Sequence, residues 1–408
     1  MANRGNQTSA GRLLAAVALA LALLGVDLPA EANSEPDLQT ALAVRVLAPP
    51  NPVLGADNKI HLAYELHVVN HSPVLITIDS IKVLDPASGA VLQDLSGARV
   101  ATITKFPGGT GTTLPPSHST YVFMDVMLPA GAAVPKEIVH RFEATRQLPR
   151  SPEDTHHGVP VTAQSGVEPT EAFTGVATPI GPPAVVISPP LKGPSWLAAN
   201  GCCGAVTSHR GAVLAINGSV YVPERFAIDF VQLDKGMRLF SGPIDQLKSY
   251  AFFGAEILSA TDGIVVTVVD GRPEQIPGSS AKGMTVNTAG GNYIVVDIGG
   301  GRFAFYAHLQ PDSMRVKPGD KVTTGQVLAR LGNTGNSDAP HLHFQVMDGP
   351  SPLKSNGLPY VFTKFTGQGV VTNEDPVYKG DLAPIDSAAM AGPHQNQLPL
   401  NNQIVSFD

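Results

Sequence analysis

Short apolar runs, separated by glycine and proline, dominate this chain and leave little room for helices. Runs such as IHLAYELHVVN (60–70) and STYVFMDVML (119–128) alternate apolar and polar residues or are rich in β-branched ones. Turn-rich pieces such as FPGGTGTTLPPS (106–117) lie between them. Side chains alternate faces along a strand, so this pattern predicts strands with a buried face. We therefore expect an all-β fold.

The same pattern divides the chain into parts. Residues 36–148 have the alternation and turn spacing of an Ig-like β-sandwich. Residues 149–195 are rich in proline, serine and threonine and predict a semi-extended linker. Residues 196–365 are strand-rich again and punctuated by glycine, which favours a second, antiparallel sheet or barrel-like domain. Residues 366–408 are polar and irregular, so we expect a tail.

The first residues have the layout of a secretory signal peptide, which we place at 1–32. Arg4 and Arg12 precede an apolar run, 13–26, and a small-residue cleavage site, AEA, follows. The run is too short to span a bilayer comfortably, and an uncleaved N-terminal anchor is the alternative. We expect an exported protein, periplasmic or extracellular, whose mature chain begins near Asn33 and has no transmembrane helix.

Charge and cysteine content restrict the partners. The formal net charge is -7 and lysine and arginine form no cluster, which argues against nucleic acid and anionic membrane surfaces. The only cysteines, Cys202 and Cys203, are adjacent. They can form a vicinal disulfide or remain two free thiols, and we assign them no chemistry.

Four histidines are the main candidates for functional residues in the second strand-rich part, residues 196–365. Between residues 196 and 365, histidine occurs only at His209, His308, His341 and His343. His341 and His343 lie in the strand-like run PHLHFQV, whose alternation puts both imidazoles on one face. Asp229 lies in RFAIDF. Neutral imidazole nitrogens and a carboxylate oxygen are the ligands that zinc takes when one position stays open for water.

Three segments occur in a fixed order: RFAIDF (225–230), GNYIVVDIGGGRFAFYAHL (291–309) and VKPGDKVTTGQVLARLGNTGNSDAPHLHF (316–344). Together they resemble the lysostaphin-like (LytM-type) zinc metallopeptidase family. Members of that family mostly cut peptide cross-links of bacterial cell walls. The resemblance implies a Zn²⁺ cofactor. It also implies that Asp229 and His343 are metal ligands, and that His308 and His341 are the two catalytic, non-ligand histidines.

The resemblance breaks at the first ligand, which the family pattern places at Arg225, four residues before Asp229. A guanidinium has no lone pair for a metal. His209 is the nearby substitute, on a strand expected to precede an Asn217-Gly218 hairpin turn. Simple register places His209 opposite Phe226 and on the wrong face, and a bulge would turn it toward the site. We expect His209 as the third ligand; the alternative is a histidine on a surface strand.

Two functions remain. The first is an exported zinc metalloendopeptidase that cleaves peptide bonds of peptidoglycan with a zinc-activated water. Its partners are peptidoglycan or its cross-linking peptides. The second is a catalytically degenerate domain that binds the cell wall or regulates a partner cell-wall hydrolase. Arg225 favours the second function, whereas the retained Asp229, His308, His341 and His343 favour the first.

Overall fold

A computed structural model describes most of the chain, and the expected signal peptide, 1–32, lies outside the described residues. The described residues are 37–106, 109–147, 155–156, 159–160, 168–204 and 206–408. The chain divides into two compact units, Met1–Gln39 and Thr40–Asp408, and nearly all described residues belong to the second. Within the described residues, no helix has the length and hydropathy of a membrane span.

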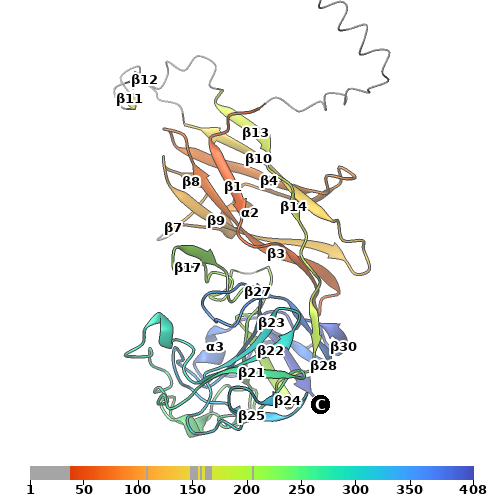
Figure 1. The fold of residues 1–408 in the computed structure, drawn as a ribbon, viewed down its shortest axis with the longest axis vertical. Helices are drawn as coiled ribbons and strands as arrows, with labels where there is room; N and C mark the ends of the chain where they lie inside the picture. Colours follow the sequence, from red (N-terminus) through yellow and green to blue (C-terminus); the bar gives the residue numbers. More distant parts are fainter. Residues whose placement is uncertain (1–36, 107–108, 148–154, 157–158, 161–167, 205) are drawn as a thin grey trace, which may run out of the picture. The chain divides into compact units, whose positions relative to one another are not determined.

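Two sheets face each other across one hydrophobic core in the first part of the second unit (Figure 1). One sheet has the order β1-β3-β9-β6-β7, with β2 beside β3: β1 Leu42–Val46, β2 Asn51–Leu54, β3 Lys59–Asn70, β6 Thr104–Phe106, β7 Gly109–Thr110 and β9 Ser119–Pro129. The other has the order β13-β10-β4-β5, with β14 and β8 at its sides: β4 Ile76–Leu84, β5 Val91–Ser96, β8 Thr113–Leu114, β10 Glu137–Arg146, β13 Thr170–Thr174 and β14 Thr178–Pro179.

The core between these two sheets explains their sequence pattern. Leu66 and Val122 from the first sheet belong to the same buried cluster as Ile81 and Phe142 from the second. Period-two alternation therefore buries one face of each sheet, and the result is a β-sandwich, called the sandwich below. The expectation of an all-β fold is confirmed. An Ig-like strand arrangement stays a prediction.

A 13-stranded sheet, called the large sheet below, forms the rest of the unit (Figure 1). Its main order is β15-β28-β31-β16-β19-β26-β23-β22-β21-β24, with β27 beside β26 and with β29 and β30 beside β28. The strands are β15 Val185–Ile187, β16 Gly193–Ala199, β19 Ile228–Gln232, β21 Gly263–Val269, β22 Tyr293–Gly299, β23 Arg302–Ala307, β24 Lys321–Val322, β26 Leu342–Met347, β27 Gly357–Leu358, β28 Tyr360–Val371, β29 Ile385–Asp386, β30 Gly392–Gln397 and β31 Gln403–Phe407.

Shorter elements complete the described fold. They are the hairpins β11 Thr155–His156 with β12 Val159–Pro160 and β17 Leu214–Ile216 with β18 Ser219–Tyr221, the pair β20 Glu256–Leu258 with β25 Val327–Arg330, the helices α2 Ala98–Ile103 and α3 Asp375–Tyr378, and the 3-10 helices η2 Leu247–Ser249 and η3 Val286–Thr288.

Strand β26 lies at the centre of the large sheet and is buried on both faces. Leu342, Phe344 and Val346 belong to the main core of the large sheet. The alternation of the strand turns the side chains of His343 and Gln345 to the opposite face. One face of β26 therefore stabilises the fold, and the other carries polar side chains.

The expectation that residues 366–408 form an irregular tail was wrong. These residues supply the end of β28 and all of β29, β30 and β31. The reason is that polar side chains are buried here in place of apolar ones, so the hydrophobic period is weak. Gln403 is 0% exposed. His394 Nδ1–H donates to Gln397 Oε1 at 2.6 Å, and the His394 ring stacks on Phe365 with 4.7 Å between centroids.

The expected linker, residues 149–195, also differs from a free connection in its described parts. Strands β13 and β14 pair with β10 and so extend the sandwich. Strand β15 pairs with β28, in parallel, and β16 begins at Gly193. Backbone pairing requires no apolar side chains, which is why proline-rich sequence concealed these strands. The precise domain boundaries stay a prediction.

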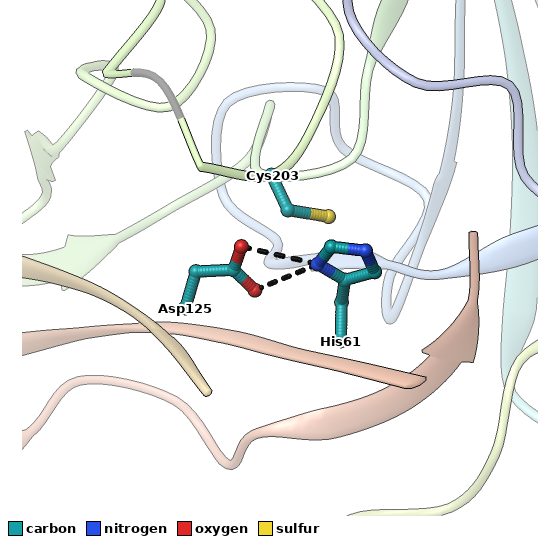
Figure 2. Close-up of side chains that lie close together, drawn as sticks. All are labelled: His61, Asp125 and Cys203. Carbon is teal, nitrogen blue, oxygen red and sulfur yellow. Dashed lines mark hydrogen bonds and ion pairs between the residues drawn. The ribbon is translucent and has the colours of Figure 1, made fainter. Parts of the chain in front are cut away.

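His61 is buried in the sandwich. It is 3% exposed. Its Nδ1 lies 3.0 Å from both carboxylate oxygens of Asp125, and its Nε2 lies 3.1 Å from Asp57 Oδ1. Cys203 lies beside them (Figure 2), but its sulfur is bonded to Cys202. An imidazole held between two carboxylates, next to a disulfide sulfur, has the bonding of an imidazolium rather than of a metal ligand.

We predict that His61 makes the stability of the protein fall at alkaline pH. Burial alone would lower the pKa of His61, but hydrogen bonds and charges from Asp125 and Asp57 raise it to about 9. The folded pKa exceeds the unfolded value of about 6.5, so the contribution is complete below about pH 6.5 and is lost as pH rises through about 9. Urea unfolding of the parent and His61→Gln, followed from pH 6 to pH 10, measures it.

The parent should exceed His61→Gln in unfolding free energy by on the order of 2–3 kcal/mol at about pH 6, and by much less at about pH 10. The exposed His71 provides the control, because His71→Gln should change stability little at either pH. A difference between parent and His61→Gln that stays constant over this range would contradict the ion pairing.

Candidate metal and catalytic site

Neighbouring strands of the large sheet bring Asp229, His343 and His308 together. Asp229 on β19 pairs directly with His343 on β26. On its other side, His343 pairs with Ala307, the last residue of β23, and His308 follows immediately. Side chains of directly paired residues lie on the same face of a sheet, so Asp229 and His343 are neighbours by construction.

The predicted hairpin around Asn217-Gly218 is confirmed, but His209 is not on it. Leu214 pairs with Tyr221 in the expected register, and both turn residues have positive φ, 50° and 80°. The ladder stops there, because Pro223 lacks an N–H and begins a turn. His209 lies before β17 in a turn, so its predicted place on a strand was wrong and no bulge is needed to orient it.

His209 nevertheless reaches the site. Its Nε2 lies 3.1 Å from Asp229 Oδ2, and the ring is 6% exposed. His343 Nδ1 lies 3.0 Å from Asp229 Oδ1. One ligand atom from each of the three residues lies within 4.8 Å of the others. The three residues expected as metal ligands are therefore together, and their metal binding stays a prediction.

The outer nitrogen of each of these imidazoles is occupied by an amide oxygen. His209 Nδ1 lies 3.1 Å from the Ala227 carbonyl oxygen, and His343 Nε2 lies 2.8 Å from Gln345 Oε1. Amide oxygens only accept hydrogen bonds, so both of these ring nitrogens carry the proton. In the neutral imidazoles, His209 Nε2 and His343 Nδ1 then present lone pairs to Asp229.

Two lone pairs and a carboxylate directed at one another repel unless a cation lies among them. Protons can supply that positive charge, and so can a metal ion. Two imidazole nitrogens and one carboxylate oxygen are a common ligand set of catalytic zinc, which keeps its remaining position for water. The hydrogen bonds to Ala227 and Gln345 are the kind that orient metal-binding histidines. The donor set thus fits zinc.

Asn200 fixes the carboxylate between these histidines. Its Nδ2 donates to Asp229 Oδ2 at 2.9 Å, and Ser208 Oγ donates to Asn200 Oδ1 at 2.9 Å. Sequence reasoning missed both Asn200 and Gln345. Gln345 could have been found, because it lies two residues after His343 on the same strand face. No local pattern marks Asn200, whose contact with Asp229 depends on the pairing of β16 with β19.

Electrostatics couples Asp229 to its neighbours. Burial by itself would raise the pKa of Asp229, but the charges of His209 and His341 hold that pKa well below its usual range. Burial would lower the pKa of His209, whereas the charge and hydrogen bond of Asp229 raise it to about 9. Asp229 is therefore an anion throughout the neutral range, and a cation bound there must displace the His209 proton.

His308 and His341, expected to be catalytic, lie beside the three ligands. Their ring centroids are 4.5 Å apart, and His341 Nε2 lies 3.4 Å from Asp229 Oδ1. His308 Nδ1–H donates to the Thr334 carbonyl at 2.7 Å, and His341 Nδ1–H donates to the Ala339 carbonyl at 2.8 Å. Each neutral ring therefore has a free lone pair on Nε2 and can accept a proton.

Backbone geometry directs His308 at the site. Its φ is 62°, which is uncommon for a residue with a Cβ, and hydrogen bonds to Gly290 and Gly332 hold the backbone on both sides. The loop around Gly291 and the loop around Gly335 cross closely. Glycine is required at both positions, because a Cβ at either would collide with the other loop. The glycines of the sequence motif thus place the Thr334 carbonyl against the His308 ring.

Arg225, at the position of the family's first ligand, takes no part in the site. It lies in a turn and its side chain is 1% exposed, bound to Glu65 on β3 at 2.6 Å. The five expected site residues instead line one cavity of about 410 Å³. Its wall also includes the acidic Glu224 and Asp338.

Comparison with known proteins adds the family. Residues 247–355, which include His308, His341 and His343, match the family model described as Peptidase family M23. The chain contains a Peptidase family M23 domain. The matched range begins after Asp229 and His209, so the arrangement of those two residues comes from the structure alone.

Curated relatives match this M23 domain over a short range. Glycyl-glycine endopeptidase ALE-1 of Staphylococcus capitis is 40% identical over 84 residues, 20% of this chain and 23% of the relative. Peptidoglycan DD-endopeptidase ShyA of Vibrio cholerae is 35% identical over 86 residues, 21% and 20% respectively. The match thus spans about a fifth of the length of these relatives. The catalytic domain of lysostaphin from Staphylococcus simulans aligns with 35% of this chain and 80% of its own, at 27% identity and a TM-score of 0.21.

We predict that Gln345 tunes the affinity of the site for zinc. Gln345→Leu removes the acceptor that fixes the His343 tautomer, so zinc should bind about 10- to 100-fold more weakly. Competition against a chromophoric chelator gives the dissociation constant. Gln232→Leu removes a surface hydrogen bond to the Pro194 carbonyl and serves as the matched control. Equal zinc affinity in the parent and in Gln345→Leu would show that Gln345 does not fix the tautomer of His343.

Proposed function

We propose that this chain is an exported zinc metalloendopeptidase that cleaves peptide bonds of bacterial cell-wall peptidoglycan. The domain match supports peptidase chemistry. The names of two relatives, a glycyl-glycine endopeptidase and a peptidoglycan DD-endopeptidase, support a cell-wall peptide as substrate. The signal-peptide pattern at residues 1–32 supports export.

One observation carries the zinc part of the proposal. Four imidazoles and one carboxylate line a single cavity, and each imidazole has its other nitrogen bonded to an amide oxygen. A site that used only one or two of these rings would not require all four tautomers to be fixed. His209, Asp229 and His343 would hold the zinc, and His308 and His341 would remain free for proton transfer.

The residues divide the chemistry of hydrolysis. Zinc held by His209, Asp229 and His343 would supply a bound water of lowered pKa and a positive charge that polarises the scissile carbonyl. The free Nε2 of His341 accepts a proton from the attacking water, and the protonated ring returns it to the leaving amine. Burial, followed by the charges of His341 and His343, holds the pKa of His308 well below its usual value. His308 therefore stays neutral and forms hydrogen bonds through Nε2.

The alternative is a catalytically degenerate domain that binds the cell wall or regulates another hydrolase. Arg225 in place of the first ligand favours it. His209 weakens this argument, because it brings an imidazole to Asp229 from another turn. The two proposals differ in a measurable property, which is zinc binding followed by bond cleavage.

We predict about one zinc ion per mature chain in the parent and far less in His209→Ala. The substitution removes one of three protein ligands without touching the strands that carry the other two. Elemental mass spectrometry of untagged protein, expressed from Asn33, measures the ratio. The control is His71→Ala, since His71 is exposed and lies in the sandwich part of the chain.

Digestion of purified peptidoglycan, followed by chromatography of the released peptides, completes this test. The parent should release peptides, and His341→Ala should retain zinc but cleave about 10²- to 10⁴-fold more slowly. A parent-like ratio of zinc to protein in His209→Ala would show that a residue other than His209 is the third ligand. A parent that holds zinc but releases nothing from any peptidoglycan would leave the regulatory function as the better account.

A further inference from the structure

Two buried arginines near the site point away from it, toward one carboxylate of the sandwich. Arg225 Nη2 lies 2.6 Å from Glu65 Oε2, and Arg225 Nε lies 2.9 Å from the same oxygen. The guanidinium also donates to the carbonyls of Ala48 and Pro49, at 3.3 Å and 3.1 Å. The side chains of Glu65 and Arg225 are 0% and 1% exposed. Arg225 thus links the large sheet to the sandwich.

Arg210 makes a second link, at the position directly after His209. Its Nε lies 3.6 Å from Glu65 Oε1, and its Nη2 donates to the Met124 carbonyl on β9 at 3.0 Å. Its Nη1 donates to the Cys203 carbonyl. His209 and Arg210 share one tight turn, residues 207–211, which is called the His209 turn below. The anchor of Arg210 therefore restricts where the His209 ring can lie.

The His209 turn is also joined to the carboxylate side of the site. The Arg210 backbone N–H donates to Thr207 Oγ1 at 3.2 Å, and Thr207 Oγ1 donates to the Asn200 carbonyl at 3.0 Å. Asn200 in turn holds Asp229. A displacement of Arg210 would therefore be felt by two residues of the proposed metal site, His209 directly and Asp229 through Asn200.

The opposite side of this junction belongs to the sandwich. Figure 2 shows Cys203 beside His61 and Asp125, which lie on β3 and β9. The charges at the junction are mixed: Glu65 and Asp125 lie near Arg210 and Arg225, and His61 lies between Asp125 and the half-buried Asp57. Val53, Ala56 and Ala63 of the sandwich also belong to the main hydrophobic core of the large sheet. The junction is thus packed, as a fixed support must be.

We propose that Glu65 is a positioning residue for the metal site: the sandwich holds Arg210 through the charge of this carboxylate, 3.6 Å away, together with the Met124 carbonyl, and Arg210 holds the His209 turn against Asp229. The inference rests on the proposed function, because the ion concerned is the zinc that His209 would bind. It assigns the sandwich a role in completing the site. Arg225, which cannot bind zinc, shares the same carboxylate and so belongs to this support.

The physical reason is the cost of an unpaired buried charge. Without the Glu65 carboxylate, Arg225 loses its ion pair and Arg210 loses one of its two nearby carboxylates, in a place closed to water. The two guanidiniums repel and shift, and Arg210 takes the His209 turn with it. Ligands that are displaced by a fraction of an ångström bind zinc less tightly, because the ion requires its ligands at fixed distances.

The experiment measures zinc affinity in the full mature chain by competition with a chromophoric chelator. Glu65→Gln keeps the shape of the side chain and removes its charge, and we expect the zinc dissociation constant to rise about 10- to 100-fold. Glu171→Gln is the matched control. It breaks a partly buried ion pair of the sandwich, between Glu171 on β13 and Arg146 on β10, and should leave zinc affinity unchanged.

A second measurement separates positioning from general loss of structure. In a His209→Ala background, Glu65→Gln should weaken residual zinc binding much less than in the parent, because the direct route through His209 is gone and only the route through Asn200 to Asp229 remains. An equal loss in both backgrounds would overturn the proposal, and so would parent-like affinity in Glu65→Gln. If Glu65→Gln does not fold, Arg210→Lys replaces it, since lysine keeps the charge but loses the forked contacts. Parent-like affinity in Arg210→Lys would likewise overturn the proposal.

These outcomes are distinct from failure of the proposed function. A parent chain without zinc contradicts the metallopeptidase and removes the basis of this inference with it. A parent that binds zinc and digests peptidoglycan, with Glu65→Gln unchanged in zinc affinity, contradicts only the role of Glu65.

Discussion

The buried carboxylate of Asp229 is the constraint on which the site depends. An anion removed from water must be compensated by hydrogen bonds and positive charge, or it destabilises the fold. Here strand pairing supplies His343, a separate turn supplies His209, and Asn200 supplies an amide N–H. When His209 and His343 are neutral, their hydrogen bonds to Ala227 and Gln345 leave ring lone pairs directed at this carboxylate. A metal ion satisfies all of these groups at once.

The chain has exchanged the roles of two positions. Arg225, where the family pattern expects a ligand, connects the large sheet to Glu65 of the sandwich. His209, in a turn outside that pattern, brings an imidazole to Asp229. The neighbour of His209, Arg210, lies 3.6 Å from the carboxylate of the same Glu65. Arg225 and the neighbour of His209 are thus connected through a single carboxylate of the sandwich.

Sequence patterns predicted what local alternation controls. The main strands of the sandwich and the turn at Asn217-Gly218 follow from period two and turn chemistry. His341 and His343 line one cavity, although β26 begins at Leu342 and leaves His341 outside the strand. The place of His209 could not be predicted, because proline at 223 ends the hairpin and tertiary contacts then position the turn. The C-terminal strands were missed because buried glutamine and histidine satisfy each other there. Asn200 and Glu65 act across long sequence separations that no single-sequence pattern reveals.

The most direct test of the central claim is anomalous diffraction at the zinc absorption edge, on crystals of the full mature chain grown with zinc. The account predicts one strong peak with His209 Nε2, Asp229 and His343 Nδ1 at about 2.0–2.2 Å, and with Arg225 still bound to Glu65. A zinc peak without His209 among its ligands would contradict the account. So would the absence of a zinc peak at Asp229 in crystals grown with excess zinc.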